Sequence, residues 1–263
     1  MGFSGSQETF HDRKDMSGFH RGAYRLPFSG TIPRHEPFSL DEFAERKSRR
    51  VLRLKKGDLV WLLDSTGVYR KCICLGFNQK RRLRFQATAE VVPGREPSPL
   101  LLALPPIRDA GFETLLRQTS EIGIEKVQCI RTRFSRTPKP AGETKISRWN
   151  RLLLSSALQS GRSRPVALDV NPITLPELLE RETERTVVVL DSTGSPFSDS
   201  TEFRQNLSFP LLVLLGPEGG WSDEEREFFK KRNLFLFSLG DTTLKTDTAA
   251  VSSCFFLLRI LNS

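Results

Sequence analysis

The stretch Leu211–Ser222 reads LLVLLGPEGGWS, and it decides the fold class of this chain of 263 residues. Five apolar residues in a row predict a strand that is buried on both faces, as in a parallel sheet covered by helices. Ligands of such sheets bind beyond the carboxyl ends of the strands. The three glycines after the strand allow positive φ angles and carry no Cβ atom, so a ligand can reach the backbone directly. We therefore predict an α/β fold with a binding loop at Gly216–Gly220.

Alternating strand and helix patterns continue on both sides of this stretch. Parallel strands are predicted at 100–104, 126–132, 186–191, 211–215 and 234–239. Helices are predicted at 112–122, 146–159, 175–184, 223–232 and 248–261. The last helix is apolar nearly all round, so it must be buried either in the core or against another subunit. We favour a dimer contact.

The first 99 residues have a different pattern. Residues 1–22 show no apolar period and are predicted to be a mobile extension. Residues 23–92 are predicted to form a small β-barrel, with a helix at 40–50 and short strands at 51–54, 58–64, 68–75 and 82–92. Three prolines in residues 93–99 are typical of an interdomain linker. The α/β domain is expected to occupy residues 100–263.

The net charge of +9 is concentrated in one region of the chain. The segment Arg46–Arg84 contains thirteen Lys and Arg residues against two Asp residues, a local charge of +11. Such a concentration is the usual electrostatic signature of a nucleic-acid surface, although a solvated basic face has the same composition. Both interpretations remain open at this point.

Several classes of protein are disfavoured by composition. The histidines are confined to the first 35 residues, which leaves none for a catalytic triad or a metal cluster in the body of the chain. The four cysteines have the spacing of neither a disulfide framework nor a four-ligand zinc site, so we expect no metal. Neither a stretch of membrane-spanning length nor the apolar segment of a signal peptide is present, which predicts a cytoplasmic protein without a membrane segment.

The residues after the glycine loop narrow the choice of ligand. Ser222 and Glu225 fit a capping box at the start of a helix with an acidic first turn. That turn disfavours a phosphate, and the loop has the spacing of neither a dinucleotide-binding nor a Walker A motif. An uncharged or cationic adenosyl ligand fits better. A second loop, Gly240–Thr248, follows the strand at 234–239, and two loops at neighbouring strand ends would form a pocket.

Together these two loops, LLGPEGGWSDEE and SLGDTTLKTDTAA, resemble the RsmE family of SPOUT methyltransferases. Three earlier segments match the family in the same order: Val51–Asp58, Ser120–Ile124 and Gln159–Arg162. The resemblance covers about residues 45–260. It implies a homodimeric enzyme that transfers a methyl group from S-adenosylmethionine to N3 of a uridine in 16S ribosomal RNA of the small subunit. It also implies a C-terminal α/β domain tied in a trefoil knot and an N-terminal PUA-like β-barrel that helps to hold RNA.

The resemblance also assigns site residues by position. The cofactor pocket would be lined by Leu215, Gly216, Pro217, Glu218, Gly219, Gly220, Leu239, Gly240, Leu244 and Thr246. Arg162 and Arg53 are the candidates for contacting RNA. Because the uracil N3 proton must leave, a nearby cation would favour the uracil anion, and Arg162 or Lys245 could serve as that catalytic cation. No general base is named.

The second loop departs from the family pattern. Lys245 and Asp247 stand where the family has Arg and Glu, which preserves charge but changes reach and bidentate geometry. One alternative is therefore a non-catalytic RNA-binding factor for ribosome assembly with a degenerate pocket. Another is a metabolite-binding α/β enzyme that does not act on RNA. The retained glycines of the first loop favour the methyltransferase.

Overall fold

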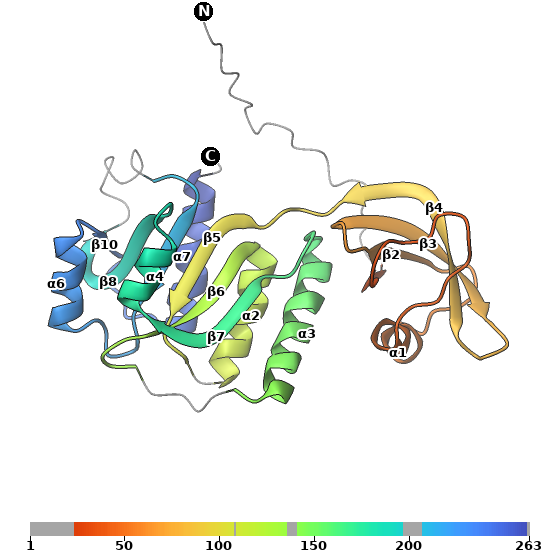
Figure 1. Ribbon diagram of the computed structural model, residues 1–263, viewed down its shortest axis with the longest axis horizontal. Helices are drawn as coiled ribbons and strands as arrows, with labels where there is room; N and C mark the ends of the chain where they lie inside the picture. Colours follow the sequence, from red (N-terminus) through yellow and green to blue (C-terminus); the bar gives the residue numbers. More distant parts are fainter. Residues whose placement is uncertain (1–23, 108, 136–140, 197–206, 262–263) are drawn as a thin grey trace, which may run out of the picture. The chain divides into compact units, whose positions relative to one another are not determined.

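The computed structural model describes residues 24–107, 109–135, 141–196 and 207–261 (Figure 1). The extension predicted at residues 1–22 lies outside these ranges. The chain divides into two compact units. Of the described residues, unit 1 contains 24–65 and Tyr69–Val92, and unit 2 contains Thr66–Val68 and those from Pro93 onward.

Unit 1 is built around a four-stranded sheet with the strand order β1-β2-β3-β4. Its elements are β1 (Tyr24–Pro27), α1 (Glu42–Arg50), β2 (Leu59–Leu63), β3 (Val68–Phe77) and β4 (Leu83–Pro93). Strand β2 pairs in parallel with β1 and antiparallel with β3. Helix α1 begins where the Asp41 carboxylate accepts a hydrogen bond from the Ala44 N–H at 2.8 Å. Apolar residues from the sheet and the helix form one core.

The strand predicted at 51–54 is wrong. Val51 is the C-cap of α1, and Arg53 has a φ of 52°, which a strand residue does not adopt. The Leu54 N–H donates to the Ser48 carbonyl at 3.0 Å, so the chain turns back onto the end of the helix. Alternating residue types mimicked a half-buried strand here, although Val51 is 69% exposed.

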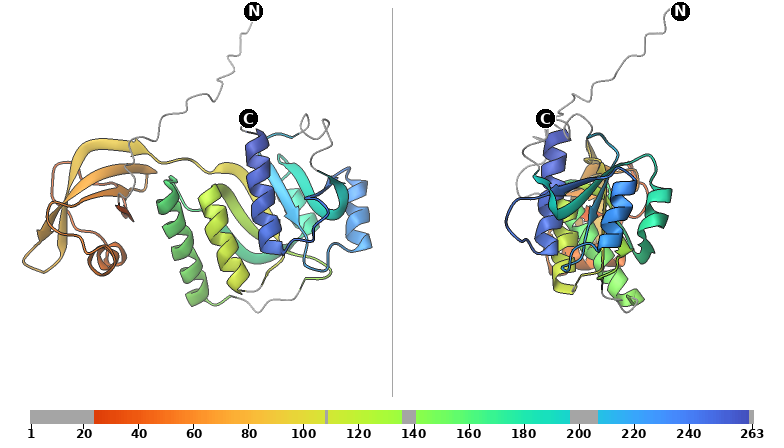
Figure 2. Two further views of the ribbon diagram at one scale, coloured as in Figure 1. Left: turned by 180° about the vertical axis from the view of Figure 1, so that it is seen from behind. Right: turned by 90° about the vertical axis from the view of Figure 1, so that its left-hand side faces the viewer.

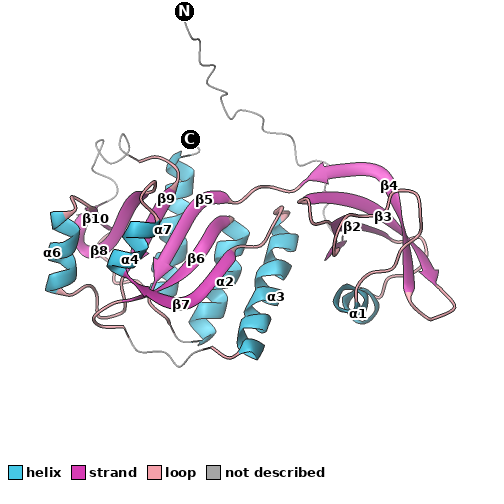
Figure 3. Ribbon diagram, viewed as in Figure 1, coloured by secondary structure: helices cyan, strands magenta, loops and turns pink. Residues whose placement is uncertain are grey.

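Unit 2 contains a six-stranded parallel sheet with the order β10-β8-β9-β5-β6-β7 (Figure 3). The strands are β5 (Ser98–Leu104), β6 (Ile124–Arg131), β7 (Ala167–Thr174), β8 (Thr186–Pro196), β9 (Leu211–Leu215) and β10 (Phe235–Ser238). The helices are α2 (Asp109–Ile122), α3 (Glu143–Ser160), α4 (Leu175–Arg181), α6 (Asp223–Lys231) and α7 (Thr246–Leu261). The predicted α/β fold and parallel sheet are confirmed.

Helices cover both faces of this sheet. Figure 2 shows α2, α3 and α7 on one side and α4 and α6 on the other. In β5, Leu100, Leu102 and Leu104 belong to the core under the first group, whereas Leu101 and Ala103 belong to the core under the second. Successive side chains of a strand point to opposite faces, and here both faces are covered. The unbroken apolar strands follow from this burial.

Strand β7 was not predicted. It lies at the edge of the sheet and is only partly buried along its length. Its sequence contains Asp169, Asn171 and Pro172, which interrupt the apolar pattern. An edge strand tolerates these residues because one of its sides makes no ladder hydrogen bonds.

Helix α7 is buried on one face only. Ala250, Cys254 and Leu257 are fully buried in the core, whereas Phe255 is 56% exposed. The helix was expected to be buried all round. Within this chain, only the face that packs into the core is buried.

The proline-rich stretch at 93–99 is short and anchored. Strand β4 ends at Pro93 and β5 begins at Ser98. Between them, the Arg95 N–H donates to the Gly161 carbonyl and the Arg95 carbonyl accepts from the Ser163 N–H, each at 2.9 Å. These bonds make the segment part of unit 2 rather than a free tether. Among the described residues, no helix is long and apolar enough to cross a membrane.

Candidate functional site

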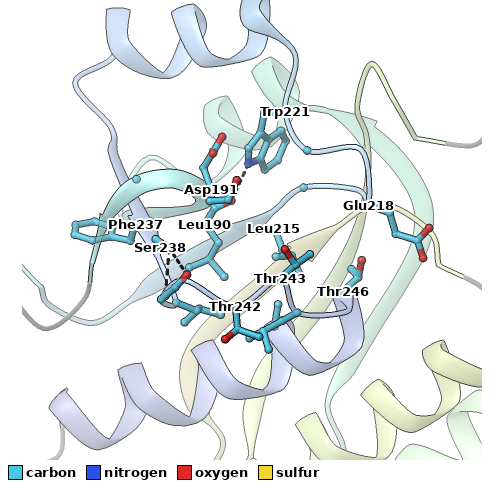
Figure 4. A pocket seen from close by; sticks show the side chains of 18 of the residues that line it. Leu190, Asp191, Leu215, Glu218, Trp221, Phe237, Ser238, Thr242, Thr243 and Thr246 are labelled. Atoms are coloured by element: carbon cyan, nitrogen blue, oxygen red, sulfur yellow. Dashed lines mark hydrogen bonds between the residues drawn. The ribbon is translucent and has the colours of Figure 1, made fainter.

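A cavity of about 620 Å³ lies at the carboxyl ends of β8, β9 and β10 (Figure 4). These strands lie near one edge of the sheet, with β8 between the other two. Because parallel strands end on the same side, the segments that follow them meet there. The cavity is lined by the glycine loop after β9, by the loop between β10 and α7, and by five residues of β8: Leu190, Asp191, Ser192, Gly194 and Pro196.

The structure brings together all ten residues that the resemblance assigns to the cofactor pocket. They line this one cavity: Leu215, Gly216, Pro217, Glu218, Gly219, Gly220, Leu239, Gly240, Leu244 and Thr246. The two loops are separated in sequence by the whole of α6 and β10. Their convergence is a property of the parallel sheet.

Trp221 holds the glycine loop in place. Its indole Nε1 donates a hydrogen bond to the Leu190 carbonyl at 2.9 Å, and the side chain is almost fully buried (Figure 4). A Cβ atom on Gly216 would stand 3.1 Å from this indole, so the close approach favours glycine. Gly220 has a φ of 71°, in the left-handed region. The loop is thus tied to β8.

The second loop is shaped by Ser238 and by the start of α7. The Ser238 hydroxyl accepts from the Gly240 N–H at 3.2 Å and donates to the Gly240 carbonyl at 3.0 Å (Figure 4). Thr246, the first residue of α7, is buried at the cavity wall. The loop therefore lines the cavity between two fixed ends.

The cavity wall contains an ion pair that was not predicted from the sequence. The Asp191 side chain is 2% exposed, and its Oδ2 accepts from Arg226 Nε at 2.9 Å. Its Oδ1 accepts from the backbone N–H and the hydroxyl of Thr193, each at 2.8 Å. Burial opposes ionisation of Asp191, but these hydrogen bonds and the charge of Arg226 outweigh it and lower its pKa. An acidic residue at the carboxyl end of a predicted parallel strand was the available signal.

Lys245 adjoins the cavity without lining it. Its side chain is exposed, and its carbonyl accepts from the Ala249 N–H in the first turn of α7. Its neighbours Leu244 and Thr246 both line the cavity.

The structure does not place Arg162 in the cavity of its own chain. Its Nη2 donates to the carbonyl oxygens of Glu121, at 3.0 Å, and Ile122. The guanidinium packs against Gly123, where any Cβ atom would overlap it. Burial, and then the nearby charge of Arg95, lower the pKa of Arg162. Because Gly123 precedes β6, Arg162 lies at the end of the sheet where the parallel strands begin. The cavity lies at the opposite end, where they finish.

Arg53 belongs to unit 1 and is exposed in the turn after α1. The predicted capping box of α6 is confirmed: the Ser222 N–H donates to Glu225 Oε2 at 2.8 Å, and the Glu225 N–H donates to Ser222 Oγ at 3.2 Å. In the part of the chain that the structure describes, no cluster of three or more His, Cys, Asp or Glu side chains could hold a metal ion.

Residues 94–257 match the family described as RNA methyltransferase domain. This chain belongs to that family. Its relatives include proteins named ribosomal RNA small subunit methyltransferase E. The one from Synechocystis sp. is 32% identical over 208 residues, which cover 76% of this chain and 66% of the relative. The one from Helicobacter pylori strain 26695 is 28% identical over 204 residues, which cover 78% of this chain and 82% of the relative.

A further relative and a solved structure are also similar to this chain. The matched part of this chain spans just under two thirds of the Synechocystis relative and 62% of a relative from Helicobacter pylori strain J99. A crystal structure of ribosomal RNA small subunit methyltransferase E from Neisseria gonorrhoeae, bound to S-adenosylmethionine, has the same fold, with a TM-score of 0.75 at 20% identity. The aligned region covers 90% of this chain and 98% of the Neisseria gonorrhoeae chain. The resemblance recognised in the two loops is confirmed.

Proposed function

We propose that this protein is an S-adenosylmethionine-dependent methyltransferase that modifies N3 of a uridine in 16S ribosomal RNA of the small subunit. One observation carries the proposal: two loops that are distant in sequence line a single cavity at the carboxyl ends of β8, β9 and β10. Membership of the RNA methyltransferase family supports the reaction type. The names of the relatives support the small ribosomal subunit as the substrate.

The cavity suits this cofactor in size and in chemistry. Its volume of about 620 Å³ lies within the range of roughly 300–1,000 Å³ of small-molecule pockets. Gly216 and Gly220 bring bare backbone to the wall, and Leu215 and Leu239 add apolar surface beside it. When bound, S-adenosylmethionine supplies a methyl group attached to a positively charged sulfur. The sulfur, with the rest of the cofactor, is a good leaving group.

The chain would then contribute position and charge. Holding the uracil N3 in line with the methyl group supplies most of the acceleration through proximity and orientation. We propose that Lys245, at the cavity edge, favours the uracil anion after loss of the N3 proton. Arg53 and Arg162 remain predicted RNA contacts. Because Arg162 lies at the opposite edge of the sheet, a catalytic role for it would have to act on the cavity of a second protomer.

The finer architecture is proposed on the same basis. We propose that unit 2 contains the trefoil knot of the family and that unit 1 is a PUA-like β-barrel that holds RNA. The high density of Lys and Arg between residues 46 and 84 supports the RNA-binding role. We further propose a homodimer that uses the exposed side of α7, where Phe255 is 56% exposed.

The test combines purified protein, isotopically labelled S-adenosylmethionine and small ribosomal subunits that lack the modification, followed by mass-spectrometric mapping. We expect one methyl group on N3 of one uridine. A Gly216→Val variant should be inactive because its side chain meets Trp221. Gly142→Val, at a position with no atoms within 4 Å of an added Cβ, is the matched control and should remain active. Cofactor binding without methyl transfer would favour the assembly-factor alternative.

A further inference from the structure

Arg226 lies in the wall of the cavity, where two carboxylates hold its guanidinium. Its Nε donates to the buried Asp191 carboxylate at 2.9 Å, and its Nη1 lies 3.6 Å from Asp223 Oδ1. Its Nη2 lies 3.6 Å from the point where a Cβ atom on Gly220 would stand. The planar guanidinium is therefore fixed through Nε on one side, and its Nη2 faces the glycine loop. The Arg226 side chain is 27% exposed, which leaves part of it accessible from the cavity.

The charges around the cavity favour a ligand that carries positive groups together with one negative group. Among the described residues that line it, three carry carboxylates and only Arg226 carries a guanidinium. The carboxylate of Asp191 is already paired with Arg226, whereas Glu218 and Asp241 are exposed. S-adenosylmethionine has one carboxylate, together with an ammonium and a sulfonium group. The two exposed acids would attract its cations, and Arg226 is the group that would attract its carboxylate.

An RNA phosphate fits the same guanidinium less well. The first turn of α6 contains Asp223, Glu224 and Glu225, and Asp223 is directly beside Arg226. A polyanionic backbone that approached Arg226 from outside would meet these three carboxylates. A small zwitterion inside the cavity would not have to pass along them.

We infer that Arg226 binds the carboxylate of S-adenosylmethionine and that Asp191 acts as a positioning residue that orients Arg226. The inference rests on the proposed function and goes beyond it, because it assigns one end of the cofactor to one side chain. Nε is held by Asp191, so the Nη edge is the part of the fork that donates to the ligand.

The test compares two ligands by isothermal titration calorimetry on the full-length protein. Decarboxylated S-adenosylmethionine differs from the cofactor only in lacking the carboxylate. We expect the wild-type protein to bind S-adenosylmethionine roughly 10- to 100-fold more tightly than the decarboxylated ligand, as for a charge-assisted hydrogen bond. Arg226→Gln should lose about that factor for S-adenosylmethionine and leave the decarboxylated ligand unchanged.

Two further variants separate binding from positioning. Arg226→Lys should recover only part of the affinity, because an ammonium cannot reproduce the planar fork. Asp191→Asn should weaken S-adenosylmethionine binding by less than Arg226→Gln, again without affecting the decarboxylated ligand. Arg232→Gln is the matched control: Arg232 caps the other end of α6 and stacks 3.8 Å from the Phe228 ring centroid, outside the cavity. Its affinity for both ligands should equal that of the wild type.

Several outcomes would overturn the inference. Equal binding of both ligands by the wild-type protein would overturn the inference on its own, even if Arg226→Gln fails to fold. An equal loss of affinity for both ligands in Arg226→Gln would show a purely structural role, and an effect on RNA affinity alone would assign Arg226 to the RNA. In each of these cases the wild-type enzyme would still bind the cofactor and methylate RNA. Loss of the proposed function itself would appear as a wild-type protein that binds neither ligand.

Discussion

Gly220 and Gly219 are adjacent in the glycine loop but differ in backbone conformation. Gly220 has a φ of 71°, whereas the backbone at Gly219 lies outside the left-handed region. An added Cβ at Gly219 would meet Phe134 Cβ at 3.4 Å, and one at Gly220 would meet only Arg226 Nη2, at 3.6 Å. Space is therefore available at both positions, and the strain of the backbone distinguishes them.

We predict that Gly220→Ala lowers the free energy of unfolding by about 1–2 kcal/mol, the cost of a left-handed conformation for a residue with a Cβ atom. Gly219→Ala should change it by less than about 0.5 kcal/mol. Urea unfolding of both variants measures the difference. Equal stability of the two variants would show that the loop relaxes out of the left-handed conformation.

The Arg162 guanidinium holds the end of α2 through two hydrogen bonds. Arg162→Gln removes the hydrogen bonds to the Glu121 and Ile122 carbonyls at the end of α2. It should lower the free energy of unfolding by about 1–3 kcal/mol and leave S-adenosylmethionine affinity unchanged. The matched control is Arg164→Gln, because Arg164 is 63% exposed and lies 3.5 Å from Glu96 in a surface ion pair. A normal stability with reduced affinity would instead show that Arg162 contributes to the cofactor site.

The ion pair between Asp191 and Arg226 joins β8 to α6. Burial opposes ionisation of Asp191, but the Thr193 and Arg226 hydrogen bonds lower its pKa below its ordinary value. A lowered pKa in the folded state means that the stabilisation is fully present above the unfolded pKa of about 4. It is lost as the pH falls through the folded pKa.

We predict that Asp191→Asn costs about 1–3 kcal/mol of unfolding free energy at pH 7. The difference from the wild type should shrink as the pH falls below about 4, since protonation removes the same charge from Asp191 in the wild type. Urea unfolding at a series of pH values measures this. A difference that stays constant down to pH 2.5 would mean that the carboxylate charge does not contribute to holding β8 against α6.

Across the whole molecule, positive charge is concentrated in unit 1. In unit 1, the guanidinium of Arg49 lies 5.4 Å from the ring centroid of Phe77, which is 59% exposed. An exposed aromatic ring beside a cation is suited to stacking on an unpaired base. We predict that Arg49→Gln weakens RNA binding and reduces the salt dependence of log K by about 1, with unchanged S-adenosylmethionine affinity. Lys231→Gln, on α6 of unit 2, is the charge-matched control, and an equal effect in both variants would contradict a basic RNA surface on unit 1.

The proposed homodimer is a property of the whole molecule as well. Phe255 projects from the face of α7 that does not enter the core. We predict that the wild type sediments as a dimer and that Phe255→Asp shifts it to a monomer, because a carboxylate would be buried without a partner in the interface. Val91→Asp, at a 45% exposed position in unit 1, should remain dimeric. A Phe255→Asp protein that stays dimeric would place the interface elsewhere.

Features that depend only on residues close together in the sequence were predictable. The apolar run of β9 requires burial on both faces whatever covers it, and the capping box of Ser222 and Glu225 closes within three residues. Where an apolar period is absent or misleading, prediction failed: β7 carries polar residues because it lies at an edge, and Val51–Leu54 alternates in a turn. The recognition of the two loops rested on their sequences, but their meeting depends on the order of the strands.

The order of residues along the chain was enough to predict a parallel α/β sheet, a bare-backbone loop after one of its strands, and a concentration of positive charge between residues 46 and 84. These are consequences of local residue types. The pairing of Asp191 with Arg226, 35 residues away, and the position of Arg162 at the end of the sheet opposite the cavity emerge from the three-dimensional fold. Both depend on which strand ends come together, and that is set by long-range packing of the sheet, which no spacing along the chain encodes.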